Sequence, residues 1–290
     1  MKKTVLILGG TRFIGRYILE LLNNDIFDVY YFHRGKTCFE PKVSSVEILG
    51  NRTNEDDVQQ LFKQNFDVVI DISGERYEMV RLSVQYAKQN KPYYIFISSS
   101  SVYRQSTEAH NESDSLDLDC ASSYTRDKIK SEKLVEDSFE KYAIIRPSKV
   151  YGPYNHINRE QYFYEKLKKQ DSIVLSRDPV LHFTYVEDLA DGVCQILNKE
   201  LTGIYNVAGK EPVRLSRFIE EIAKNMKASF SISWSNKTEA PLSDIPTCIL
   251  NIQKMYDLCG WKPQFSLEEG MYNTLIYLKG RCKRTIASTP

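Results

Sequence analysis

Short apolar runs alternate with amphipathic segments along the first half of the chain. The apolar runs are rich in β-branched and aromatic residues and predict five buried strands, over residues 5–8, 29–33, 46–49, 68–72 and 93–97. The segments between them repeat apolar residues at helical spacing and predict helices from residue 13 onward, over 56–64 and over 78–89. This alternation predicts right-handed βαβ units and a parallel sheet. The fold class is therefore α/β, a Rossmann-type doubly wound parallel sheet.

The first predicted strand ends in a glycine-rich turn that suits a dinucleotide phosphate. Gly9 lets the backbone turn sharply, and Gly15 lets the following helix pack close to the sheet. The free N–H groups and partial positive charge at the start of that helix attract a pyrophosphate. The predicted cofactor-binding residues of this turn are Gly9, Thr11, Arg12, Phe13, Ile14 and Gly15. An ordinary strand–turn–helix, with glycines for packing alone, is the alternative.

The end of the second predicted strand favours NADP(H) over NAD(H). NAD-binding folds place an acidic residue there to hold the adenosine ribose hydroxyl. This chain has Arg34 at that point and Arg12 inside the glycine turn. Two guanidinium groups can bind a 2′-phosphate through charge-assisted hydrogen bonds. Asn51 could hydrogen-bond an adenine edge, and the small residues Ser73 and Gly74 leave room for the cofactor.

Tyr124 and Lys128 lie one helical turn apart and therefore share a helix face. An ammonium beside a phenol favours the phenolate, so we expect Lys128 to lower the pKa of Tyr124 from its reference value of about 10. Such a tyrosine can exchange a proton with a substrate oxygen. A serine from residues 98–101 can hydrogen-bond the same oxygen. In a chain with 19 tyrosines this spacing also arises by chance, so the pair needs support from other motifs.

Charge and cysteine content narrow the class of protein. The 290 residues carry a formal net charge of +1, which offers no electrostatic case for nucleic acid or an acidic membrane surface. The apolar runs are far shorter than the roughly 20 residues of a membrane helix. The six cysteines show no CxxC spacing and no cluster with the four histidines, so no metal site is predicted. We expect reduced thiols in a cytoplasmic protein.

Several motifs in one order resemble the extended short-chain dehydrogenase/reductase family, which includes NAD(P)-dependent nucleotide-sugar epimerases, dehydratases and reductases. They are the glycine turn, the serines before Val102-Tyr103, the Tyr124–Lys128 pair and the segment IRPSKVYGP at 145–153. The later segments TYVEDLA, YNVA and LCGWKP, which begin at residues 184, 205 and 258, agree with the family pattern. The likeness covers nearly the whole chain.

The resemblance implies roles for individual residues. Tyr124 takes the place of the catalytic acid/base, and Lys128 that of its partner, which also binds the nicotinamide ribose. Counting back three residues from Val102 places Ser99 at the catalytic serine or threonine position, with Ser100 as the fallback. The residues in the places that contact the nicotinamide carboxamide are Pro147, Ser148 and Val150.

The resemblance also implies a smaller, discontinuous C-terminal substrate-binding domain. We expect residues 1–153 to form the NADP-binding Rossmann domain, which also receives residues from about 180 to 210. Residues 154–178 and 211–290 would then form the substrate-binding part. Amphipathic patterns predict C-terminal helices over 188–197, 217–226 and 267–278. The family further implies a homodimer that pairs helices, including the helix of Tyr124.

This chain departs from the family pattern in two places. The middle glycine of the turn is Arg12, a version shared by a subset that includes chloroplast RNA-binding relatives. The arginine near Leu181 that holds the substrate diphosphate in many epimerases is missing. The residues that could take its place are Arg159, Arg177 and Arg214, and Ser100 is a further candidate for substrate binding.

Within this family, these residues favour an NADPH-dependent reductase acting on a keto group of a nucleotide-linked deoxysugar, such as a 4-keto-6-deoxyhexose. Arginines that select a 2′-phosphate favour the reductive cofactor pool, whereas a family epimerase usually keeps NAD bound and recycles it. A nucleotide-sugar 4-epimerase is the alternative enzyme. A family dehydratase would carry an acidic pair where this chain has Ser100 and Ser101. The non-enzyme alternative is a cofactor-binding regulatory or RNA-binding protein on the same fold. The complete Ser–Tyr–Lys set and the small net charge oppose it.

Overall fold

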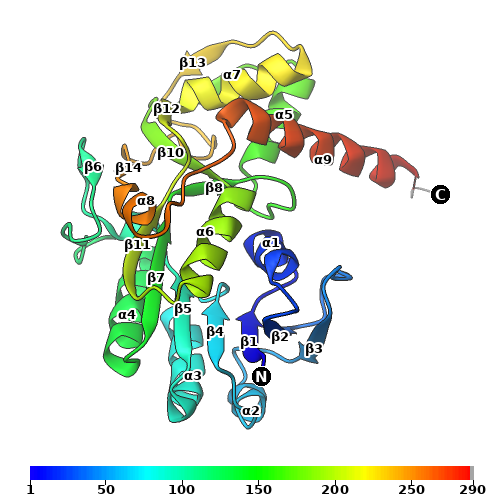
Figure 1. The fold of residues 1–290 in the computed structure, drawn as a ribbon. Coiled ribbons are helices and arrows are strands. Elements are labelled where there is room, and N and C mark those ends of the chain that lie inside the picture. Colours follow the sequence, from blue (N-terminus) through cyan, green and yellow to red (C-terminus); the bar gives the residue numbers. More distant parts are fainter. Residues whose placement is uncertain (288–290) are drawn as a thin grey trace.

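A central parallel sheet forms the core of the N-terminal half (Figure 1). The structure, a computed structural model, describes residues 1–287, with side chains described up to residue 280. Within this part of the chain, seven strands form the sheet in the order β11-β7-β5-β4-β1-β2-β3, and all neighbours run parallel. The strands are β1 (Lys3–Leu8), β2 (Phe27–His33), β3 (Ser45–Leu49), β4 (Val68–Asp71), β5 (Tyr93–Ile97), β7 (Tyr142–Pro147) and β11 (Gly203–Val207). The strand order reverses direction between β1 and β4, which confirms the predicted doubly wound fold.

Helices cover both faces of this sheet, because its strands are apolar on both sides. Helices α1 (Phe13–Leu21) and α6 (Val186–Asn198) pack together on one face, in the same core as Val5 and Ile7 of β1. The core of the other face contains Leu6 and Leu8 together with residues of α2 (Glu55–Leu61), α3 (Tyr77–Ala87) and α4 (Ser123–Ser138). Alternate side chains of a strand point to opposite faces, so a central strand buried on both sides must be continuously apolar.

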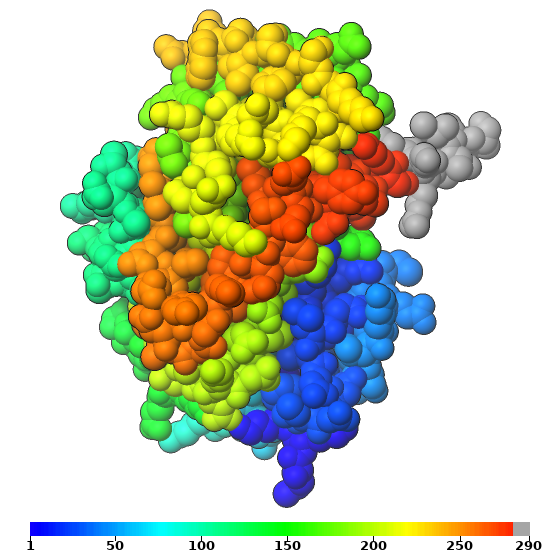
Figure 2. All heavy atoms as spheres, turned by 45° about the horizontal axis from the view of Figure 1, so that its top comes forward, coloured from blue at the N-terminus to red at the C-terminus, as the bar shows by residue number. Residues whose placement is uncertain are grey.

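Most of the remaining elements, which are green to red in Figures 1 and 2, lie above the central sheet in the view of Figure 1. Small sheets pair β10 (Val180–Tyr185) with β8 (Lys149–Tyr151) and β12 (Pro212–Arg214), β9 (Ile173–Leu175) with β13 (Ile232–Trp234), and β6 (Ala109–His110) with β14 (Ile249–Leu250). The helices here are α5 (Glu160–Lys168), α7 (Leu215–Met226), α8 (Gln253–Cys259) and α9 (Leu267–Ala287). Helix α7 packs against both α5 and α9. Two short 3-10 turns, η1 (Lys88–Asn90) and η2 (Ser100–Val102), follow α3 and β5.

The predicted strands and helices of the first half are present, with small differences at their ends. Strand β5 has the predicted bounds, whereas α2 ends at Leu61 and is shorter than the predicted 56–64. The larger difference concerns β10, which we expected to belong with the nucleotide-binding part. It pairs with β8 and β12 in a small sheet, and only the following α6 and β11 return to the central sheet. A buried apolar run predicts a strand, but it does not select the partner of that strand.

Candidate active site

An open cavity of about 710 Å³ lies at the carboxyl ends of the central strands. In a parallel α/β sheet this edge is where ligands bind. Val150 of β8 and Cys248, which immediately precedes β14, line its other end. The predicted site residues that line this cavity are Gly9, Thr11, Arg12, Phe13, Ile14, Arg34, Asn51, Ser73, Ser99, Ser100, Tyr124, Lys128, Pro147, Ser148, Val150 and Arg159. The fold therefore brings most of the predicted cofactor, catalytic and substrate residues to one place.

The glycine turn has the geometry that a bound pyrophosphate requires. Gly9 has a φ of +104°, and a Cβ there would lie 2.8 Å from the Cβ of Ser73. A Cβ on Gly15 would lie 2.1 Å from the Gly9 carbonyl oxygen, so Gly15 acts through packing and does not line the cavity. Arg12 has a φ of −128°, which any residue can adopt, and this explains why the turn accepts an arginine. No side chain caps the start of α1, so its first N–H groups remain for a phosphate.

The adenosine end of the cavity carries cations. The Arg12 Nε donates to the Thr37 Oγ1 at 2.7 Å, and Arg34 and Lys36 line the same region. Within the described residues, none of these three forms an ion pair with a carboxylate. The Asn51 side-chain oxygen accepts from the Thr53 hydroxyl at 2.9 Å, so its amide NH₂ is the group left for an adenine. These residues fit a cofactor with an added phosphate on its adenosine ribose.

The three predicted catalytic side chains meet in the cavity. Ser122 caps the start of α4, and Tyr124 and Lys128 share one face of this helix because they are four residues apart. The Lys128 Nζ lies 5.8 Å from the centroid of the Tyr124 ring and donates to the Ile97 carbonyl oxygen at 2.6 Å. The hydroxyl of Ser99, two residues after β5, interacts with the Tyr124 phenol and favours its ionised form. The arrangement can hold a substrate oxygen between a serine hydroxyl and a phenol.

The pKa of Tyr124 differs from the sequence prediction. Desolvation by the surrounding protein raises it, although 42 % of the residue is exposed toward the open cavity. The interaction with Ser99 and the charge of Arg159 lower it, and Glu75 raises it further. The prediction that Lys128 lowers this pKa was wrong for the protein alone, because the ammonium is directed to the Ile97 carbonyl and is itself desolvated. Tyr124 is therefore protonated at neutral pH and ready to donate a proton.

Lys128 gives a testable dependence of stability on pH. Desolvation lowers its pKa to about 8, compared with about 10.4 in an unfolded chain. Between these values the unfolded chain holds one more proton than the folded protein, so stability rises with pH. We expect the free energy of unfolding of the wild type, minus that of Lys128→Met, to rise by roughly 3 kcal/mol between about pH 8 and about pH 10.4. Urea denaturation of both proteins measures this, and a difference that stays flat over this window would contradict the buried, desolvated ammonium.

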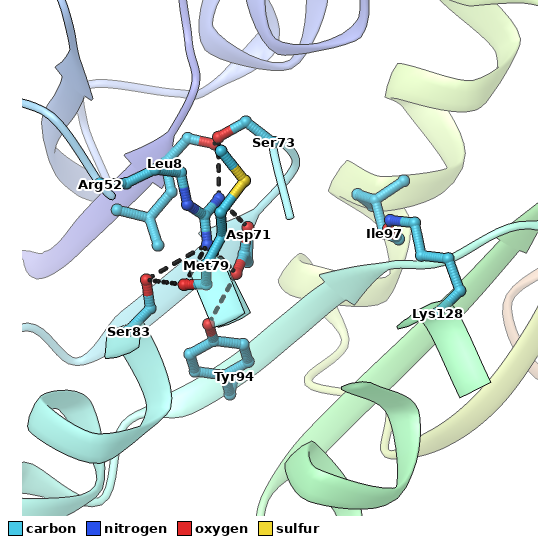
Figure 3. A network of polar contacts seen from close by, with 9 residues as sticks. All are labelled: Leu8, Arg52, Asp71, Ser73, Met79, Ser83, Tyr94, Ile97 and Lys128. Carbon is cyan, nitrogen blue, oxygen red and sulfur yellow. Dashed lines mark hydrogen bonds and ion pairs between the residues drawn. The ribbon is translucent and has the colours of Figure 1, made fainter. Parts of the chain in front are cut away.

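Arg52 and Asp71 form a buried ion pair beside the cavity that was not predicted from the sequence. The Arg52 guanidinium donates to both carboxylate oxygens of Asp71, at 2.6 and 2.8 Å, and the Tyr94 hydroxyl donates to the same carboxylate at 2.9 Å (Figure 3). Arg52 also donates to the Ser73 hydroxyl, which in turn donates to the Leu8 carbonyl oxygen. Arg52 is 7 % exposed and Asp71 fully buried. The pair links the loop after β3 to the end of β4. It therefore helps to position the residues on the cofactor side of the cavity. Its signal in the sequence was an aspartate at the end of an apolar strand.

Besides Gly15, the predicted site residues Gly74 and Arg214 do not line the cavity. Gly74 does not line the cavity, because a Cβ on it would lie 2.6 Å from a methyl of Val80 and so face the core. Arg214 also lies outside the cavity. It is in β12, at the outer edge of its small sheet, and its guanidinium lies 3.9 Å from the Asp178 carboxylate. Arg177, a further candidate, does not line the cavity either. We therefore do not keep Gly74 as a cofactor contact or Arg214 as a substrate contact.

Arg159 and Ser100 do lie at the substrate end. The Arg159 Nη1 donates to the Val150 carbonyl oxygen at 2.8 Å, which fixes the guanidinium beside the cavity. The Ser100 hydroxyl is buried and has no hydrogen-bond partner within the described residues, and the same holds for Ser101. Buried hydroxyls without partners at the wall of a cavity suit a polar ligand.

Other sequence predictions concern metals, membranes and thiols. No group of three or more histidine, cysteine or acidic side chains in the described residues could hold a metal ion. None of the described helices has both the length and the apolar character needed to cross a bilayer. Cys38, Cys120, Cys194, Cys248 and Cys259 are free thiols. Cys282 lies beyond the described side chains.

The sequence model of the family described as "NAD dependent epimerase/dehydratase family" matches residues 5–208, which include the glycine turn and the Tyr124–Lys128 pair. The chain belongs to this family. The match confirms the resemblance to the extended short-chain dehydrogenase/reductases.

Individual relatives cover almost the whole chain. It is 28 % identical to the chloroplast stem-loop binding protein of 41 kDa b of Arabidopsis thaliana, over 93 % of this chain and 78 % of that protein. It is 22 % identical to a UDP-N-acetyl-alpha-D-glucosaminuronate decarboxylase of Bacillus cytotoxicus, over 96 % of this chain and 98 % of that one. The crystal structure of UDP-glucuronic acid 4-epimerase from Bacillus cereus, in complex with UDP-glucuronic acid and NAD, superposes with a TM-score of 0.81 at 22 % identity, over 96 % of this chain and 99 % of that one. At this identity the likeness to the solved structure shows the fold.

Proposed function

We propose that this protein uses NADPH to reduce a keto group on a nucleotide-linked sugar, a 4-keto-6-deoxyhexose being the first candidate. The observation that carries the proposal is the meeting of Ser99, Tyr124 and Lys128 in the cavity that the glycine turn also lines. The free cations Arg12 and Arg34 at the adenosine end support NADP(H) as the cofactor. Family membership supports a nucleotide-sugar substrate.

The chain's own residues supply orientation and a proton. When bound, the nicotinamide supplies a hydride to the carbonyl carbon of the sugar. Tyr124, protonated at neutral pH, donates its proton to the carbonyl oxygen, while the Ser99 hydroxyl hydrogen-bonds that oxygen. The Ser99 hydroxyl and the charge of Arg159 favour the resulting phenolate, which regains a proton from water through the open cavity. The Lys128 ammonium donates one of its three N–H groups to the Ile97 carbonyl oxygen. Its other N–H groups can bind a ribose hydroxyl.

The cofactor preference is tested at Arg34. Removal of its guanidinium in Arg34→Ala should weaken NADPH binding about 10- to 150-fold, because a charge-assisted hydrogen bond contributes about 1.5–3 kcal/mol. NADH binding should stay within about twofold of the wild type, since NADH lacks the 2′-phosphate. Quenching of protein fluorescence by each cofactor gives both dissociation constants. Equal weakening for the two cofactors, or a wild type that prefers NADH, would contradict the assignment.

The activity is tested with a panel of 4-keto sugar nucleotides that vary in base and sugar. The expected result is oxidation of NADPH, seen as loss of its absorbance, with at least one member of the panel. NADPH that stays unchanged across a broad panel would count against the reductase.

A 4-epimerase is the second candidate, and the names of the relatives favour it. The similar solved structure is a 4-epimerase in complex with NAD. The same serine, tyrosine and lysine would then remove and return a proton during oxidation and reduction of one sugar carbon. Cofactor retained through purification, with product formed and no net loss of NADPH, would select this candidate.

Stem-loop binding is the non-enzyme candidate, favoured by the name of the Arabidopsis relative. The net charge of +1 opposes it, since neutralisation of phosphates by basic residues dominates nucleic-acid affinity. Binding of an RNA stem-loop that weakens steeply with salt, in a protein without turnover, would select this candidate over the enzyme.

A further inference from the structure

The substrate end of the cavity holds two cations. Lys149 lies at the start of β8, and Arg159 immediately precedes α5, ten residues later in the chain. Both line the cavity, together with Thr247 and Cys248 from the segment before β14. Lys149 was not predicted as a site residue. The residues beside it in the IRPSKVYGP segment, Pro147, Ser148 and Val150, were predicted to contact the cofactor. Strand β8 pairs with β10, with Lys149 opposite Phe183, and this pairing sets Lys149 at the cavity wall.

Neither cation has a carboxylate oxygen within ion-pair distance in the described residues. Within the described residues, Lys149 and Arg159 form no ion pair, and Arg159 bonds only to the Val150 carbonyl oxygen. Glu160, the acid next to Arg159 in sequence, accepts from the Gly152 N–H and the Asn155 amide. The positive charge at this end of the cavity is therefore left for a ligand.

Burial makes these free charges costly. Desolvation lowers the pKa of Lys149, and Arg159 lowers it further, so the two charges lie close enough to repel each other. Desolvation also lowers the pKa of Arg159. The acids that line the cavity, Glu75 and Asp117, contribute to neither shift. Glu160 partly offsets the charge of Arg159. Neither cation forms an ion pair within the described residues, and two such desolvated like charges favour the binding of an anion.

Position 181, near which the resemblance to the family implies an arginine, supplies no cation here. Leu181 is fully buried in β10 and does not line the cavity. Arg177 and Arg214 lie outside the cavity, as described above. Lys149 and Arg159 therefore supply two cations at this end of the cavity, and the exposed Arg104 also lines the cavity.

We propose that Lys149 and Arg159 together bind the negatively charged group of the substrate. The proposal rests on the proposed function, since it assigns a substrate to the same cavity. The anion has two possible sources, the diphosphate that links nucleotide to sugar or a carboxylate on the sugar itself. Arg159 is close enough to Tyr124 to act on its phenol, so the bound anion lies near the reacting carbon. Lys149 then acts as a binding residue that sets the charge of the accepted substrate.

The test is calorimetric titration of NADP-saturated protein with two simple probes, inorganic pyrophosphate and D-glucuronate. Saturation with NADP keeps pyrophosphate out of the glycine turn. We expect one of the probes to bind the wild type, and Lys149→Gln and Arg159→Gln each to weaken that binding about tenfold or more, as expected for loss of a charge-assisted hydrogen bond. Arg214→Gln is the matched control, because it removes an arginine outside the cavity, and it should bind as the wild type does. Binding of pyrophosphate assigns the diphosphate, and binding of glucuronate assigns the carboxylate.

Failure of this proposal can be separated from failure of the proposed function. If neither probe binds the wild type, or if both glutamine variants bind like Arg214→Gln, the anion site is overturned even where turnover is seen. If a probe binds and depends on Lys149 while no nucleotide sugar is turned over, the anion site stands and the reductase is rejected. Near-identical circular dichroism and NADP affinity for all three variants show that each is folded.

Discussion

Replacement of Tyr124 by phenylalanine is expected to lower kcat by about 10²- to 10⁴-fold, the range typical for loss of a general acid. The substitution removes only the hydroxyl that gives a proton to the substrate oxygen. NADPH affinity and the free energy of unfolding should stay close to wild type, because the ring is partly exposed in the cavity and keeps its contacts. Steady-state kinetics with an accepted keto sugar nucleotide measures kcat, and urea denaturation measures the free energy of unfolding.

A matched control is Tyr256→Phe. Tyr256 is also exposed, and it lies on α8, outside the cavity. It should retain wild-type turnover. If Tyr124→Phe also turns over at the wild-type rate, the phenol is not the proton donor, and Tyr124 loses its assigned role.

Asp71→Ala is expected to lower the free energy of unfolding by about 3–5 kcal/mol, the usual effect of removing one partner from a buried ion pair. The substitution leaves the Arg52 guanidinium buried without its carboxylate and removes the acceptor of the Tyr94 hydroxyl (Figure 3). Because Arg52 also bonds to Ser73, the cofactor side of the cavity should be disturbed too. Urea denaturation and NADPH titration measure the two effects.

The comparison for this prediction is an exposed ion pair. Glu200 pairs with Lys3 and Lys141 at the surface. Glu200→Gln should cost less than about 1 kcal/mol, as exposed pairs usually do. A double variant that replaces Arg52 and Asp71 by methionine and leucine should recover much of the stability lost in Asp71→Ala. If Asp71→Ala and Glu200→Gln lower the free energy of unfolding by similarly small amounts, the buried pair does not stabilise the fold more than an exposed pair does.

The sequence predicted the features that depend on local spacing. The glycine turn joins a strand to a helix within a few residues, and Tyr124 and Lys128 are separated by one helical turn. In such patterns the spacing along the sequence determines which residues lie close together in the structure. The alternation of apolar runs and amphipathic segments predicted the parallel sheet for the same reason.

The features that the sequence did not predict depend on contacts between distant segments. Arg52 and Asp71 can pair because the parallel strands place the loop after β3 and the end of β4 on the same edge of the sheet. Lys149 reaches the cavity because β8 pairs with β10 and leaves the central sheet. The raised pKa of Tyr124 follows from burial that no sequence pattern specifies. Each of these three features can be predicted only when it is known which strands pair or which residues line the cavity.

We propose that hydride and proton reach one sugar carbonyl in this cavity, the proton coming from Tyr124. It is tested most directly with NADPH that carries deuterium at the transferred position and a panel of keto sugar nucleotides. Mass spectrometry of the product should show one deuterium on the new carbinol carbon for each NADPH consumed in the wild type, and almost none with Tyr124→Phe over the same time. A product without deuterium, or equal incorporation by the two proteins, would contradict the account.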